Sequence, residues 1–91
     1  MYLTAGVNRS GTITTGGTAQ QLAPRNPSRR ALTGQNISSG DLWINEVGGI
    51  AAVDMAGSYK VPAGESFAVE TSQAVSIIGA TTGQKFTATE V

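Results

Sequence analysis

The stretch that decides the fold is residues 66–91, which read SFAVETSQAVSIIGATTGQKFTATEV. Apolar and polar side chains alternate there in three segments, which are 66–70, 74–79 and 85–91. A period of two is typical of a β-strand that buries one face. The alternation places Phe67 and Val69 on one face of the first segment, and Val75 and Ile77 on one face of the second.

Upstream of this stretch, glycines and prolines divide the chain at short intervals and leave no window long enough for a stable helix. We predict further strands over 11–15, 19–23, 31–37, 42–47 and 50–55. Gly16-Gly17 is predicted to join the first two of these as a tight hairpin. Residues 49–55 fit a short helix or a strand, and the flanking glycines favour the strand.

The predicted strands have recognisable inner faces. Leu42 and Ile44 are expected to point inward, and Leu32, Gly34 and Asn36 share one face of their strand. About seven or eight short strands in one small chain predict an all-β fold, either an antiparallel β-sandwich or a jelly-roll-like barrel. We expect residues 1–91 to form a single β-sandwich domain, with residues 1–10 as an extended N-terminal arm.

Composition indicates a protein that associates with others. The chain of 91 residues has 13% charged residues and a formal net charge of zero, whereas about 25% is usual in soluble domains. Small domains gain stability from disulfides, metals or association, and this chain has no cysteine or histidine. We therefore expect a homo-oligomer, a dimer or trimer, with a weakly charged monomer as the alternative.

The same residue inventory predicts a protein that is not an enzyme. No histidine is present as a general base and no cysteine as a nucleophile. Lys60 and Lys85 have no Ser-x-x-Lys spacing, and the acidic residues are scattered singly. The glycines match neither a P-loop nor a dinucleotide fingerprint. We expect no catalytic residue, no cofactor and no metal.

Three arginines, Arg25, Arg29 and Arg30, lie in one proline-containing loop. A pI near 6.1 and the absence of aromatic residues among them argue against nucleic acid as the partner. Guanidinium groups suit paired contacts with carboxylates of a protein partner. A contact with a protein and a solvated loop remain the two interpretations.

Trp43 is the only tryptophan, and it alternates with the inward Leu42 and Ile44. An outward ring there suits a protein contact or stacking on a sugar, and packing at a sandwich edge is the third interpretation. The candidate interface residues are therefore Arg25, Arg29, Arg30 and Trp43. The N-terminus lacks the pattern of a signal peptide and no apolar run is long enough for a spanning helix, so we expect no membrane partner.

Several short motifs form a larger pattern. They are GGTAQ at 16–20, NPSRR at 26–30, GQN at 34–36, LWI at 42–44 and PAGE at 62–65. This pattern resembles that of small β-sandwich structural proteins of tailed bacteriophage virions. Gly34 departs from it, because a bulkier strand residue is expected there, and this indicates a bulge or a close approach of the backbone.

The resemblance implies a virion component made in the bacterial host cytoplasm and located on the capsid surface. Its expected function is that of a capsid decoration or cement subunit that stabilises the head by binding the major capsid protein or other virion proteins. The alternative is a tail- or fibre-associated host-recognition module that binds carbohydrate. For Arg29 and Arg30 the resemblance implies a role in bracing their loop or in meeting a capsid carboxylate.

Overall fold

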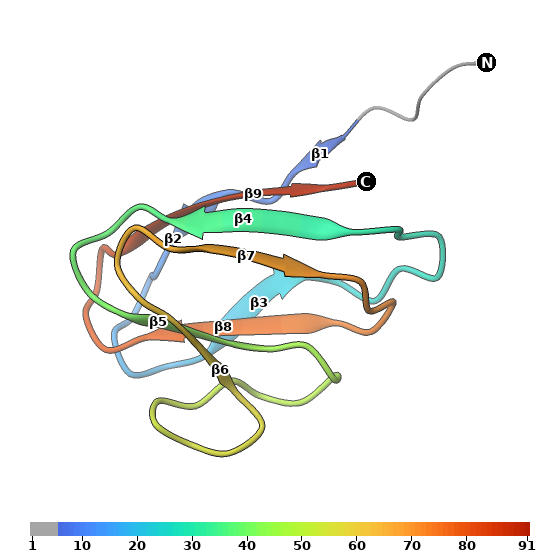
Figure 1. Cartoon of the computed structure of the whole chain (residues 1–91). Coiled ribbons are helices and arrows are strands. Elements are labelled where there is room, and N and C mark those ends of the chain that lie inside the picture. The colour runs from blue at the N-terminus through green and yellow to red at the C-terminus, as the bar shows by residue number, and fades with distance from the viewer. Residues whose placement is uncertain (1–5) are drawn as a thin grey trace.

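The alternating C-terminal stretch forms three strands, and two antiparallel sheets share them. The computed structural model describes residues 6–91, and Figure 1 shows the arrangement of their strands. β7 (Ser66–Val69) and β9 (Lys85–Glu90) belong to the first sheet, and β8 (Val75–Gly79) belongs to the second. Their inward positions Val69, Val75 and Ile77 are buried, as predicted.

Six further strands complete the two sheets. They are β1 (Val7–Asn8), β2 (Gly11–Thr12), β3 (Gln20–Ala23), β4 (Leu32–Asn36), β5 (Leu42–Asn45) and β6 (Tyr59–Val61). Sheet A has the order β1-β9-β4-β7, with β2 also paired to β9, and sheet B has the order β3-β8-β5-β6. The described residues contain no helix, and thus none long and apolar enough to cross a membrane.

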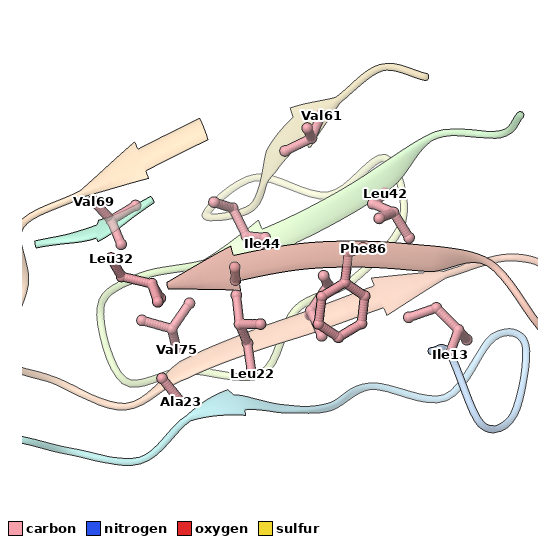
Figure 2. Close-up of a cluster of buried hydrophobic side chains, with 12 residues drawn as sticks. Ile13, Leu22, Ala23, Leu32, Leu42, Ile44, Val61, Val69, Val75 and Phe86 are labelled. Atoms are coloured by element: carbon pink, nitrogen blue, oxygen red, sulfur yellow. The ribbon is translucent and has the colours of Figure 1, made fainter. Parts of the chain in front are cut away.

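The core lies between the two sheets, where Figure 2 shows side chains from both of them meeting. Its buried members are Ile13, Leu22, Ala23, Leu32, Leu42, Ile44, Val61, Val69, Val75, Ile77, Phe86 and Ala88. They are nearly all aliphatic, and apart from Ile13 and the consecutive pair Leu22 and Ala23 at the register shift of β3 they occupy alternate strand positions, so each sheet buries one face. The architecture is the predicted β-sandwich.

Gly34 marks a close approach of the backbone, one of the two features expected at this position. It pairs with Phe67 across β4 and β7, and the Phe67 ring covers it. A Cβ at Gly34 would overlap this ring and the carbonyl oxygen of Thr87. Glycine is therefore required because an aromatic side chain fills the space above it.

The predicted Gly16-Gly17 hairpin is wrong in its pairing. β2 pairs with β9 in sheet A, whereas β3 pairs with β8 in sheet B, so the chain crosses between the sheets. Ile13 enters the core at the crossing and is fully buried. The glycines still form a turn, because the N–H of Thr18 donates to the carbonyl of Thr15 at 3.1 Å across them.

The predicted strand over 50–55 is also wrong, because these residues belong to the loop between β5 and β6. Asp54 has a φ of 55°, a left-handed conformation that ends any extended run. Of the predicted N-terminal arm, Val7–Asn8 forms strand β1 beside β9, while residues 1–5 lie outside the described residues.

Candidate functional site

Three loops leave the sandwich at one end, and their positions can be followed in Figure 1. They comprise residues 24–31 after β3, 46–58 after β5 and 70–74 after β7, and we call them together the loop end. The backbone N–H of Asn26 donates to the carbonyl of Ser72 at 2.9 Å, and the Gln73 side chain lies against Gly48. The three loops therefore form one connected surface.

Arg29 is the centre of this end, and its side chain is fully buried, with 0% exposed. Its Nη1 donates to the carbonyls of Thr71 and Gln73, at 2.6 and 2.8 Å, and its Nη2 donates to the carbonyl of Pro24 at 2.5 Å. Its Nε donates to Oε2 of Glu90 at 2.6 Å. As a candidate for contact with a partner Arg29 is therefore wrong, because all of these bonds are internal and brace the loop.

Glu90 joins this network to the N-terminal edge of sheet A. Its carboxylate is 2% exposed and also accepts hydrogen bonds from Nε and Nη2 of Arg9, at 3.1 and 2.8 Å. Burial alone would raise the pKa of Glu90, but the hydrogen bonds and positive charges of Arg9 and Arg29 outweigh it. The pKa of this carboxyl therefore lies below its ordinary value, and Glu90 is an anion at neutral pH.

Short polar side chains hold loop 46–58 in one conformation. Oδ1 of Asn45 accepts hydrogen bonds from the N–H groups of Val47 and Gly49, at 3.0 and 3.1 Å. Oγ of Ser76 accepts from the N–H of Ala51, and Oγ of Ser58 accepts from the N–H of Ala52, both at 3.0 Å. This loop is therefore bound to the outer side of sheet B rather than projecting freely.

The side chains that loop 46–58 turns to solvent are apolar. Val47, Ile50 and Met55 are 71%, 80% and 60% exposed. Ile50 also lines a hollow of about 250 Å³ between this loop and strands β3 and β8, with Gln21 and Ser76 on its other walls. Exposed apolar groups that gather on one loop indicate an interaction surface. The sequence prediction missed this surface, because it assigned residues 50–55 to a strand.

Arg25 and Arg30 lie at the same end and are exposed. Neither takes part in an ion pair among the described residues, so both guanidinium groups face solvent there. They remain candidates for a contact with a partner, whereas Arg29 does not. The loop end thus presents aliphatic side chains and the guanidinium groups of Arg25 and Arg30, beside the acidic residues Glu46, Asp54 and Glu70, on backbone segments that hydrogen bonds hold in place.

Trp43 lies apart from the arginines, on the outer face of sheet B. It is half-buried between its cross-strand neighbours Ile78 on β8 and Lys60 on β6. The Lys60 ammonium lies 6.0 Å from the centre of the ring and 3.4 Å from Oδ2 of Asp41. The ring is therefore directed outward, as predicted, and the Lys60 side chain lies beside it.

Comparisons with known proteins give one likeness of fold. No protein-family model and no curated protein sequence matches the chain. Among solved structures, it is similar to the stem and receptor binding domain of the spike protein P1 from bacteriophage PM2, with a TM-score of 0.54 and 23% sequence identity. The match covers 88% of this chain and 32% of that one, so the chain spans about a third of the spike structure. At this identity the likeness establishes a shared fold.

Proposed function

We propose that this chain is a non-enzymatic structural module of a bacteriophage particle, and that it belongs to the apparatus that recognises the host. The observation that carries the proposal is the apolar surface of the loop end, on a fold shared with a phage spike structure that includes a receptor binding domain. The motif pattern of the sequence supports the phage origin independently of the fold. Of the two functions implied by the resemblance, host recognition has more support than capsid decoration.

The architecture suits recognition by loops. A rigid β-sandwich that presents loops at one end separates the residues that bind from those that hold the fold. Here Arg29 and Asn45 fix the backbone of the loops, and Val47, Ile50 and Met55 are left free to contact a partner. Rigid loops lose little conformational entropy on binding, which favours affinity.

Capsid decoration is the second candidate, and the outer face of sheet A favours it. This face has a shallow hollow lined by short neutral side chains, among them Thr33, Gln35, Thr87 and Thr89. A neutral surface of short side chains can be covered by a neighbour at small desolvation and entropy cost. Such a contact would place the chain in a shell of virion proteins.

The test compares binding to cells for three forms of the protein. Fluorescently labelled wild type is expected to bind cells that the phage infects, and the variant V47T/I50S/M55Q is expected to lose at least about tenfold in affinity, as removal of anchor residues does. The control I37S replaces another exposed apolar residue outside the loop end and should bind as wild type does. Binding of all three to purified capsids, but not to cells, would favour decoration.

Carbohydrate is one class of receptor for such a module, and Trp43 is the side chain suited to it. A glycan array probed with wild type and with Trp43→Ala separates this case from a protein receptor. A signal that depends on Trp43 would indicate that the binding surface is the outer face of sheet B rather than the loop end. A signal unchanged by Trp43→Ala would exclude stacking on this ring.

A further inference from the structure

The sandwich has an open side where each sheet ends in an unpaired strand. Among residues 6–91, β6 pairs with β5 alone and β7 pairs with β4 alone, so both are edge strands. The short turn 62–65 joins them, and their free edges therefore lie on the same side of the molecule, as Figure 1 shows. An edge strand presents backbone N–H and C=O groups that can pair with another chain.

Between these two edges lies a groove of about 370 Å³ with both apolar and polar groups in its lining. Its apolar residues are Ile44, Tyr59, Val61, Phe67, Ala68 and Val69, and its polar residues are Glu46, Lys60 and Ser66. Tyr59 pairs in register with the buried Ile44 and so points to the same side of sheet B, yet it is 61% exposed. Two aromatic side chains, Tyr59 and the half-buried Phe67, thus line a gap that this chain leaves unfilled.

The charge around the groove is acidic. Glu65 and Glu70 lie directly before and after β7, and Glu46 lines the groove. The nearest base, Lys60, is paired with Asp41 at 3.4 Å. Antiparallel pairing of β7 with β7 of a second copy would place Glu65 of one copy opposite Glu70 of the other, and like charges in such positions are destabilising. The groove therefore disfavours a second copy and favours a segment with basic residues.

We propose that this groove binds an extended peptide segment of another protein, which adds as a strand to the free edge of β7. Backbone hydrogen bonds along the edge would hold the segment. Every second side chain of it would be apolar and would enter the gap between Tyr59 and Phe67. Lysine or arginine at its two ends would face Glu65 and Glu70. Glu46 and Glu70 belong to the loop end, but the groove contains none of Val47, Ile50 and Met55, so the proposal does not depend on host recognition.

The test uses a labelled ten-residue peptide library of the form KK-(apolar-Thr)₃-KK, in which the apolar residue is Val, Ile, Leu or Phe. Fluorescence anisotropy measures the affinity of the protein for it. Two control libraries replace the terminal lysines by glutamates or replace one central residue by proline. We expect the basic library to bind at least about fivefold more tightly than the acidic one, because two ion pairs are gained. The proline library should not bind, because proline cannot complete the strand ladder.

Two protein variants with the same change in net charge localise the effect. E65Q/E70Q should weaken binding of the basic library about fivefold, whereas T33K/T87K on the outer face of sheet A should change it less than twofold. Hydrogen exchange of the β7 amides should slow when the peptide binds. Equal binding of the basic and proline libraries, equal effects of the two variants, or no binding at millimolar peptide would each overturn the proposal.

Discussion

The two ends of the sandwich are held by networks of different chemistry. At the loop end, the buried ions Arg29 and Glu90 join loops 24–31 and 70–74 to strand β9. The opposite end, which we call the turn end, consists of the short connections 13–19, 37–41, 62–65 and 80–84. It is held by two buried neutral amides, Asn36 and Gln84.

At the turn end each amide satisfies several backbone groups. Nδ2 of Asn36 donates to the carbonyls of Gly40 and Val61, at 2.7 and 2.8 Å. Nε2 of Gln84 donates to the carbonyl of Asp41 at 2.9 Å, and its Oε1 accepts from the N–H of Thr81 at 3.0 Å. Short turns lie close enough to one another for a short amide to join them.

The two ends differ in the side chain that joins their connections. The carbonyl of Pro24 lies on loop 24–31 and the carbonyls of Thr71 and Gln73 lie on loop 70–74, and one long guanidinium with five donors reaches all three. Its charge then requires a buried counterion, which Glu90 provides. Stability at the loop end therefore depends on an ion pair, and stability at the turn end does not.

The largest effect is expected for Arg29→Ala. It leaves Glu90 buried with Arg9 as its only cation and removes the donors from three carbonyls, and breaking a buried pair costs about 3–5 kcal/mol. Urea unfolding followed by tryptophan fluorescence measures the change in the free energy of unfolding. Arg25→Ala, an exposed position in the same loop, should change it by less than about 0.5 kcal/mol. Equal effects of the two changes would contradict the assigned role of Arg29.

The next largest effect is expected for Asn36→Ala at the turn end. The change removes the side-chain donor to the buried Val61 carbonyl, one of the donors to the Gly40 carbonyl and the acceptor for the Ser38 N–H, at a cost of about 2–3 kcal/mol. The control is Gln35→Ala on the exposed face of the same strand, with an expected cost below about 1 kcal/mol. If Asn36→Ala proved as mild as its control, water would be replacing the amide and the turn end would be less closed than described.

The networks at the two ends also show which parts of the structure could be predicted from the sequence. Alternation alone gave the correct inward faces of Leu42, Ile44 and Val69, because a period of two depends only on neighbouring residues. The burial of Arg29 could not be predicted, because its counterion Glu90 lies 61 residues away in the chain. Likewise, Gly16-Gly17 signals a turn, but whether its flanking strands pair depends on the burial of Ile13 between the sheets.

The conformation of loop 46–58 was missed for a similar reason. The N–H of Ala51 donates to Oγ of Ser76, which is 25 residues away in the sequence on strand β8. The sequence of the loop itself gives no indication of this bond. The flanking glycines favoured a strand there, whereas the apolar residues at 50, 53 and 55 left the period open; such residues are usually buried. Here Ile50 and Met55 are exposed, which is the departure from the rule that indicates function.

Acid should lower the stability of the loop end but not that of the turn end. The pKa of Glu90 lies below its ordinary value of 4.5, so the stability it contributes is present above that value and is lost as the pH falls through the lower, folded-state pKa. Arg9→Gln should raise the pKa of Glu90 and move this loss to higher pH. Asn36→Ala should leave the pH of the loss unchanged, because the amide does not titrate. NMR titration of the Glu90 carboxyl and urea midpoints between about pH 7 and 3 measure both effects.

The smallest effect on stability is expected for V47T/I50S/M55Q, the variant designed to abolish recognition. Its three side chains are mostly exposed, and the loop is held by hydrogen bonds that its backbone N–H groups donate to Asn45, Ser58 and Ser76. The free energy of unfolding should therefore stay within about 0.5 kcal/mol of wild type. Ser76→Ala makes the converse change, because it removes the acceptor for Ala51 N–H and leaves the apolar side chains in place, at a cost of about 1 kcal/mol. If the triple variant lost more stability than Ser76→Ala, the apolar side chains would be holding the loop rather than being presented by it. Their exposure would then be no argument for a binding surface.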